Sequence, residues 1–284
     1  MARETLQAGG LRLDFDPDLG GAILSLTHEG EDLLRPTPDG ATDVLETACF
    51  PLVPYANRIA DGRFTFAGRT AALSRNMAGQ AHPLHGDGWR GAWQVEAKGA
   101  DFVTLVFEPA ATEWPWRYRA RQTFRLTPDG STFEMNVLNG ADTPGPFGVG
   151  FHPYFPHSAT ARLTARTTGV WQASADLLPT ELVAAAPWAD GAPVRSERLV
   201  DHCHTGWTGP ARIDLGPGRP SLEVTATSEL GCLHVFAPPA EDFFCVEPVS
   251  HAPNALNMID PAAHGMRVLS PGENLSAWMR IALM

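Results

Sequence analysis

Four segments that lie far apart in the sequence place ionisable side chains among apolar or turn-forming residues. They are PLVPYANRIADGRF, HPLHGDGW, GVGFHPYF and FCVEPVSHAPNALN, beginning at residues 51, 82, 148 and 244. If they meet at one mouth of a β-sandwich, they bring together the guanidinium of Arg58, the imidazoles of His85 and His152, and the carboxylate of Glu247. Such a set can donate and accept protons, which is the chemistry of a general acid and a general base.

Glu247 follows the apolar run DFFCV, as if at the end of a buried strand. A buried carboxylate is costly unless it has a partner, and partial desolvation raises its pKa from ~4.3 toward neutrality. A general base working near pH 7 needs such a pKa. The position alone is equally compatible with an edge-strand glutamate that points to water.

His152 precedes Pro153, which constrains the histidine backbone to extended geometry and lacks an N–H group. We therefore expect a strand end or rim, where a histidine can face a ligand. Its unperturbed pKa of ~6.5 suits the transfer of a proton at neutral pH. The alternative is a core histidine whose ring nitrogens are both bound by backbone groups.

His82 and His85 are three residues apart, a spacing that raises the question of a metal site. We predict no metal, because the stretch contains Pro and Gly instead of helix formers and no third ligand follows nearby. His85 precedes Gly86, which suits a tight turn where the backbone approaches a ligand closely.

Arg58 follows Asn57 in a predicted loop and is a candidate forked donor to sugar hydroxyls, or otherwise part of a surface ion pair. Asp201 and His202 precede Trp207, so that a carboxylate lies near an aromatic ring in the sequence. Carboxylates that bind vicinal hydroxyls and a ring beneath the sugar suit carbohydrate binding, although an exposed loop aspartate explains the same residues.

The elements that must position these residues are predominantly strands. Turn signals such as DPDLGG, TPDG and GADTPGP recur between short runs with β-strand character, such as LRLDFD, FVTLVFE, TFEMNVLN and SLEVTAT. No βαβ alternation is visible, so the pattern predicts an all-β fold of antiparallel strands with few, short helices. We expect a single domain over residues 1–284, with long loops between about residues 167 and 220.

Composition restricts the partners and the compartment. The formal charge is −11 with no cluster of Lys or Arg, which argues against nucleic acid and membrane surfaces as partners. No stretch approaches the ~20 apolar residues of a membrane span and no signal peptide is recognisable, so we predict a cytoplasmic protein.

Four cysteines without a CxxC pair predict free, mostly buried thiols. The chain has no P-loop, GxGxxG or GxSxG motif, which leaves proton transfer without a cofactor.

Taken in order, the four segments resemble the aldose 1-epimerase (galactose mutarotase) family. The resemblance covers most of the chain: NRI at 57–59, HPLHG, FHPYF, the DH at 201–202, and VEPVSHAPNALN, with HPYF and the EP…PNALN segment the most specific. It implies a large antiparallel β-supersandwich. The implied reaction is the interconversion of the α and β anomers of a free hexose such as galactose or glucose, and it requires no external cofactor.

The resemblance also implies roles for individual residues. His152 would be the general acid toward the ring oxygen, and Glu247 the general base on the anomeric hydroxyl. Arg58, His85 and Asp201 would hold sugar hydroxyls, with Asn57 in the same substrate-binding set. Two stretches, HPLHGDGW and DHCHTGW, depart from forms common in the family, and they bear on which sugar is bound.

Three other functions remain open at this point. A carbohydrate-binding protein of the same fold would not need a matched acid and base. A hexose-6-phosphate 1-epimerase would need further cations near C6 of the sugar. A glycosidase would need two carboxylates about 5–9.5 Å apart and would leave His152 without a role. The expected partner is a small-molecule sugar, and no sequence feature specifies an oligomeric state.

Overall fold

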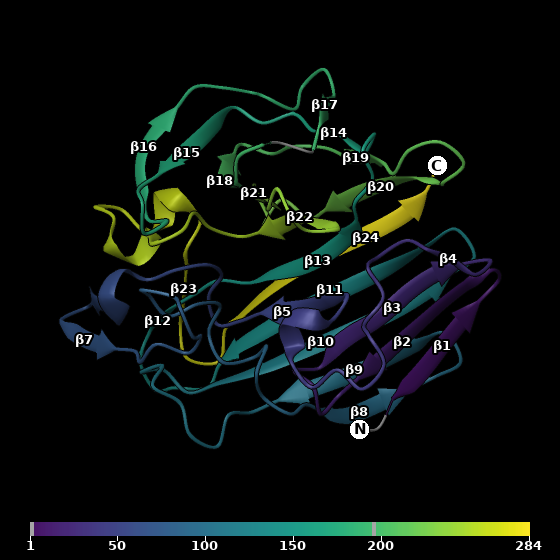
Figure 1. The fold of residues 1–284 in the computed structure, drawn as a ribbon. Helices are drawn as coiled ribbons and strands as arrows, with labels where there is room; N and C mark the ends of the chain where they lie inside the picture. The colour runs from purple at the N-terminus through teal and green to yellow at the C-terminus, as the bar shows by residue number, and fades with distance from the viewer. Residues whose placement is uncertain (1–2, 195–196) are drawn as a thin grey trace.

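Antiparallel β-strands are the dominant secondary structure of the fold (Figure 1). The structure is a computed structural model that describes residues 3–194 and 197–284. The helices in these two ranges are 3-10 helices of three residues each, too short to cross a membrane: η1 (Val44–Glu46), η2 (Ala60–Gly62), η3 (Ala255–Asn257) and η4 (Ala262–His264). The prediction of an all-β fold with few, short helices is confirmed.

The larger sheet has eleven strands, and its central strands carry the ionisable residues discussed below. In spatial order they are β1 (Glu4–Ala8), β2 (Leu11–Asp16), β3 (Ala22–His28), β5 (Cys49–Leu52), β13 (Gly150–Pro156), β22 (Phe243–Val249), β21 (Cys232–Ala237), β18 (Val200–Thr205), β15 (Gly169–Ala173) and β16 (Pro179–Val183), with β4 (Glu31–Asp32) paired to β3.

A second sheet of nine strands packs against the first. Its order is β17 (Ala192–Pro193), β14 (Arg162–Thr164), β19 (Ala211–Asp214), β20 (Ser221–Ala226), β24 (Asn274–Leu283), β11 (Gly130–Asn139), β10 (Tyr118–Thr127), β9 (Phe102–Phe107) and β8 (Gln94–Lys98). Two short pairs complete the fold: β6 (Arg63–Phe66) with β7 (Arg69–Ala72), and β12 (Gly145–Phe147) with β23 (Arg267–Leu269).

Aromatic side chains join the two sheets in one core. Strand β10 alternates between buried and more exposed positions, as a strand with one face on a core must. The rings of Phe15 on β2 and Phe124 on β10 are 5.8 Å apart, and those of Phe133 on β11 and Phe151 on β13 are 6.4 Å apart. These contacts make the molecule a sandwich of two antiparallel sheets.

Strands β13 and β22 are buried on both faces. One face of each contributes phenylalanines to the core between the sheets, Phe151 and Phe244 among them. The other face carries His152 and Glu247, which are 7% and 2% exposed. Glu247 is therefore not an edge-strand residue that points to water.

The structure corrects the prediction that residues 167–220 are mainly long loops. This region contains β15, β16, β17, β18 and β19. Strand β18 reads VDHCHT, so alternation of apolar and polar residues does not reveal it, and pairing with β15 and β21 defines it instead. Asp201 accordingly lies on a strand and not in a loop.

The structure also corrects the expected position of His152. It lies in the middle of β13, between β5 and β22, and not at a strand end or rim. Pro153, which has no N–H group, coincides with an interruption inside the sheet: the β13–β22 pairs resume only at Tyr154 after Gly150.

Gly86 holds the turn after His85 in a left-handed conformation with φ 69°. We expected the backbone here to approach a ligand closely, but it instead approaches another part of the chain. A Cβ atom added to Gly86 would lie 2.4 Å from the Val53 carbonyl oxygen. Gly68, in the turn between β6 and β7, has φ 77° but no heavy atom within 4 Å of such a Cβ.

These two glycines provide a matched test. Gly68→Ala should destabilise the protein by about 1–2 kcal/mol through backbone strain alone. Gly86→Ala should cost a further 1–3 kcal/mol, by the usual magnitude of overpacking. Urea unfolding measures both, and equal losses in the two variants would contradict the crowding described at Gly86.

Candidate active site

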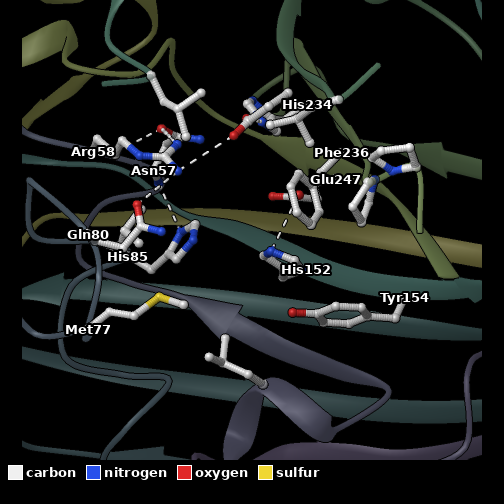
Figure 2. Close-up of a pocket in the computed structure, with 17 residues that line it drawn as sticks. Asn57, Arg58, Met77, Gln80, His85, His152, Tyr154, His234, Phe236 and Glu247 are labelled. Atoms are coloured by element: carbon white, nitrogen blue, oxygen red, sulfur yellow. Dashed lines mark hydrogen bonds and ion pairs between the residues drawn. The ribbon is translucent and has the colours of Figure 1, made fainter. Parts of the chain in front are cut away.

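One row of side chains crosses the central strands of the larger sheet and forms the floor of a pocket (Figure 2). Strand pairing sets His152 opposite Phe50 of β5, and His234 opposite Glu247. His152 and Glu247 lie side by side on β13 and β22, with Nε2 and Oε1 3.4 Å apart. The sheet itself thus brings an imidazole and a carboxyl group together.

The His152 ring packs against two aromatic rings. Its centroid lies 4.4 Å from that of Phe50 and 4.7 Å from that of Tyr154, both in stacked geometry. Its Nδ1 atom is buried and has no hydrogen-bond partner among the described residues. The alternative of a core histidine satisfied by backbone groups at both nitrogens is therefore wrong.

Burial changes the protonation of both groups. Desolvation raises the pKa of Glu247 to about 8 and lowers that of His152 to about 3. Between these values the pair holds one proton, and in the ligand-free pocket that proton resides on Glu247. Because the atoms are adjacent, its transfer to His152 would produce a carboxylate and an imidazolium without changing the net charge of the site.

A second buried pair lies next to the first. The His234 Nε2–H donates to Asp201 Oδ1 over 2.6 Å, and an Arg58 guanidinium nitrogen lies 3.6 Å from Asp201 Oδ2. Burial raises the pKa of Asp201, but the hydrogen bond and the positive charges of His234 and Arg58 outweigh it and lower the pKa overall. Burial lowers the pKa of His234, but Asp201 and Glu247 outweigh it and raise the pKa overall.

The side of the pocket away from the sheet strands is formed by two segments, residues 57–58 and 80–85. The Asn57 N–H donates to His85 Nδ1 over 3.0 Å, and the Arg58 guanidinium donates to Gln80 Oε1 over 3.2 Å. The pKa of His85 is well below its usual value, mainly because of burial, so the ring is neutral. Since its Nδ1 accepts a hydrogen bond, Nε2 carries the proton and can donate to a ligand.

The motif SHAPNALN anchors this side to the floor. His251 Nε2 accepts a hydrogen bond from the Ala56 N–H, and Asn254 Oδ1 accepts one from the Ala60 N–H. The Asn254 N–H in turn donates to the Arg58 carbonyl over 2.8 Å. These bonds span almost 200 residues of sequence and fix the backbone that carries Arg58.

The pocket has a volume of about 480 Å³, and all six residues predicted for the site line it. They come from five separated parts of the chain: Asn57 with Arg58, His85, His152, Asp201 and Glu247. Their roles remain predictions, but their convergence on one cavity is a property of the fold.

Three other residues considered from the sequence lie elsewhere. Trp207 is buried in the core between the sheets, because the chain leaves β18 at Thr205, and it offers no platform beside Asp201. The alternation of β18 turns His202 to the other face, where its Nδ1 contacts the Trp171 carbonyl. His82 accepts from the Asp61 N–H and contacts Asp176, apart from the pocket lining.

Sequence reasoning missed several residues of the pocket. The most important are His234 and Gln80, which engage Asp201 and Arg58. His234 is the middle residue of the alternating series Cys232, His234 and Phe236, a signal that it shares one face with its neighbours. The sequence does not reveal that this face adjoins Glu247, because strand pairing is non-local.

His152, Cys245 and Glu247 offer potential metal ligands whose atoms lie within 4.8 Å of one another. A metal would require the thiolate form of the cysteine. Burial, the largest influence, raises the pKa of Cys245 well above its usual value. The expectation that the site binds no metal remains a prediction. All four cysteines are free and buried, as expected.

Comparison with known proteins agrees with this geometry. The sequence model of the aldose 1-epimerase family matches residues 5–282. The chain belongs to the aldose 1-epimerase family. The uncharacterized protein YphB of Escherichia coli K12 is 36% identical over 289 residues, covering 98% of this chain and 97% of that protein.

The structure of this chain is also similar to solved structures over nearly its full length. A crystal structure from Escherichia coli K12, provisionally described as an aldose 1-epimerase, has a TM-score of 0.92 at 34% identity and covers 100% of this chain and 99% of its own. A galactose mutarotase-like protein from Clostridium acetobutylicum has a TM-score of 0.88 at 20% identity, over 99% of this chain and 94% of its own. The second likeness concerns the fold alone.

The Asp201–His234 hydrogen bond yields a direct test. Asp201→Asn keeps the size of the side chain but removes its charge, so the pKa of His234 should fall below its wild-type value. NMR titration of the His234 ring measures this pKa, with Asp39→Asn at an exposed turn as the control. An unchanged His234 pKa in Asp201→Asn would show that the carboxylate does not hold the proton.

Proposed function

We propose that this protein is a cytoplasmic aldose 1-epimerase that interconverts the α and β anomers of a free hexose, such as galactose or glucose, without a cofactor. The observation that carries the proposal is the juxtaposition of His152 and Glu247, with Nε2 and Oε1 3.4 Å apart on the floor of a pocket lined by hydrogen-bonding groups. Two proton-transfer groups at this spacing can reach the anomeric hydroxyl and the adjacent ring oxygen of one pyranose.

The reaction needs one base and one acid. In the proposed mechanism, Glu247 as carboxylate removes the proton from the C1 hydroxyl, while His152 as imidazolium gives its proton to the ring oxygen. The C1–O5 bond breaks, C1 becomes an aldehyde, and rotation about C1–C2 exposes its other face. The O5 hydroxyl then attacks C1, and both protons return. The product is the opposite anomer, with no net change in charge or oxidation state.

The protonation of the free pocket fits one stage of this cycle. With Glu247 protonated and His152 neutral, the pair has the proton distribution that the mechanism assigns to the open-chain aldehyde. Opening a bound pyranose requires the proton on His152. Hydrogen bonds from sugar hydroxyls and the positive charge of His234 would stabilise the carboxylate of Glu247 at that stage.

The remaining polar groups suit the other sugar hydroxyls. Arg58 and Nε2 of His85 are donors, and Asp201 and the side-chain oxygen of Asn57 are acceptors. Alternating donors and acceptors are appropriate for hydroxyl groups, which do both. We assign these four residues to substrate binding.

Three alternatives are less well supported. A protein that only binds sugar has no need for two coupled proton-transfer groups at its floor. For a hexose 6-phosphate, Arg58 is the only Lys or Arg among the described residues that line the pocket, and the Asp201 carboxylate beside it balances its charge. For a glycosidase, Asp201 would have to act as a second catalytic carboxyl beside Glu247, and His152 would have no role.

Substitution of either member of the pair tests the mechanism. Glu247→Gln and His152→Gln should each lower kcat/KM by about 10²- to 10⁴-fold, because each removes one proton-transfer group. Exchange NMR on galactose and glucose measures the rate after subtraction of spontaneous mutarotation. The double variant should lose little more than either single variant, since the two groups act as a unit.

Glu241→Gln, at an exposed position near the start of β22, is the matched control and should retain full activity. A Glu247→Gln protein with a rate within twofold of wild type would contradict the assignment of the base. Absence of catalysis by the wild-type protein on a broad panel of aldoses, together with sugar binding by calorimetry, would favour the binding protein instead.

The pH dependence of kcat/KM follows from the shared proton. Above about pH 8 the free pair loses its last proton and has no acid, and below about pH 3 it gains a second proton and has no base. The profile should be flat near neutrality and should fall as the pH rises through 8. Activity that continues to increase between pH 8 and 10, after subtraction of the spontaneous reaction, would be inconsistent with this pair.

A further inference from the structure

One leucine of the pocket lining has no part in the hydrophobic core. Leu177 lies in the turn of residues 174–178, which joins β15 to β16 at one edge of the larger sheet (Figure 1). Its side chain lines the pocket and is partly exposed, and among the described residues it packs against neither hydrophobic cluster. Leu177 therefore adds little to the packing of the protein itself.

The backbone of Leu177 is held in a left-handed conformation, with φ 66°. This conformation is unfavourable for a residue with a bulky side chain, whereas glycine adopts it without that cost. Such strain persists only where the surrounding structure imposes it, and strained residues are concentrated at sites that bind or act on a ligand. A leucine at this position therefore indicates a role for its side chain in the pocket.

Hydrogen bonds to Ser174 fix the 174–178 turn. The Leu177 N–H donates to the Ser174 carbonyl over 3.0 Å, and the Leu178 N–H donates to the Ser174 hydroxyl oxygen over 3.1 Å. The Ser174 hydroxyl in turn donates to Oδ1 of Asp176. These bonds hold the backbone around Leu177 and leave Oδ2 of Asp176 for a partner outside the turn.

That partner is His82, a buried histidine that does not line the pocket. His82 is 4% exposed, and its Nδ1 accepts a hydrogen bond from the Asp61 N–H over 3.0 Å. Its Nε2 therefore carries the proton and donates to Asp176 Oδ2 over 3.1 Å. We call this second bond the latch. It joins the turn to segment 80–85, whose Gln80 lines the same pocket.

We propose that Leu177 contacts the C–H groups of the bound sugar and that the latch positions Leu177 for this contact. The inference rests on the proposed epimerase function and adds a substrate-binding residue to it. A pyranose carries apolar C–H groups between its hydroxyls, and contact with an aliphatic side chain removes both surfaces from water. His82 and Asp176 do not contact the sugar in this account. They act through Leu177, as positioning residues.

Leu177→Gly separates the contact with the sugar from the stability of the fold. Glycine removes the side chain and relieves the left-handed strain, while it makes the unfolded chain more flexible. Because these two effects on stability oppose each other, the urea midpoint of unfolding should stay close to that of the wild-type protein. The variant should therefore fold, and a change in its kinetics reports the loss of the side chain.

Exchange NMR on galactose and glucose gives kcat and KM after subtraction of spontaneous mutarotation. In Leu177→Gly, KM should rise by about tenfold, at the lower end of the usual value of an apolar contact because Leu177 is only partly buried. The value of kcat should stay within about twofold, because the contact is the same in the ground state and the transition state. Leu177→Met keeps an apolar side chain of similar volume and should retain the wild-type KM.

Asp176→Ala tests the latch. Loss of this hydrogen bond should raise KM by about three- to tenfold, the usual value of one such bond. Asp176→Asn keeps an oxygen that accepts from His82 and should retain the wild-type KM, and Asp190→Ala at an exposed turn is the matched control. In the double variant, Asp176→Ala should add little to the effect of Leu177→Gly, because the latch acts through the Leu177 side chain.

The outcomes separate this inference from the proposed function. A Leu177→Gly protein with the wild-type KM for both sugars overturns the contact and leaves the epimerase intact. Fully additive effects of Leu177→Gly and Asp176→Ala overturn the role of the latch. If the wild-type protein accelerates no aldose, the epimerase proposal fails, and calorimetry then tests the contact through the Kd of the same sugars, which should rise in Leu177→Gly. Absence of both catalysis and binding overturns both proposals.

Discussion

A buried carboxyl group and a buried imidazole that share one proton are the constraint on which the rest of the site depends. An isolated ionised carboxylate in this position would be very costly, and the protein avoids that cost by keeping Glu247 protonated when the pocket is free. The same arrangement allows the Glu247 carboxylate and the His152 imidazolium to form, because this needs only the movement of one proton between atoms that are 3.4 Å apart. A ligand that supplies hydrogen bonds can then shift the proton.

The sheet enforces this geometry through register. Side chains directly opposite on neighbouring antiparallel strands lie ~4.5–5.5 Å apart at Cβ, so adjacent strands bring two groups together without any loop. A slip of one residue in β22 would turn Glu247 into the core and present Val246 or Pro248 to His152. Such a slip is opposed because it would remove Phe244 and Val246 from the core between the sheets, where they are packed.

Sequence patterns predicted the local features of this protein, but they did not predict the features that depend on which strands lie side by side. Turn residues and short β-rich runs predicted an antiparallel all-β fold, and ionisable residues in apolar contexts identified His152 and Glu247. Strand β18 escaped detection because DHCH carries no apolar alternation. His234 escaped because its significance depends on which strand lies beside β21, and hydrophobic patterns do not encode strand order.

Specificity and chemistry are supplied by different parts of the fold. The proposed acid and base lie on central strands, where any change disturbs packing on two faces. The groups that would contact sugar hydroxyls lie on segments 57–58 and 80–85 and near the start of β18. The first of these segments is held by the backbone N–H groups of Ala56 and Ala60, which donate to His251 and Asn254. HPLHGDGW and DHCHTGW, which depart from common family forms, occur in these peripheral parts. In the proposed function, substitutions in these peripheral parts can therefore change which sugar is bound while His152 and Glu247 stay fixed.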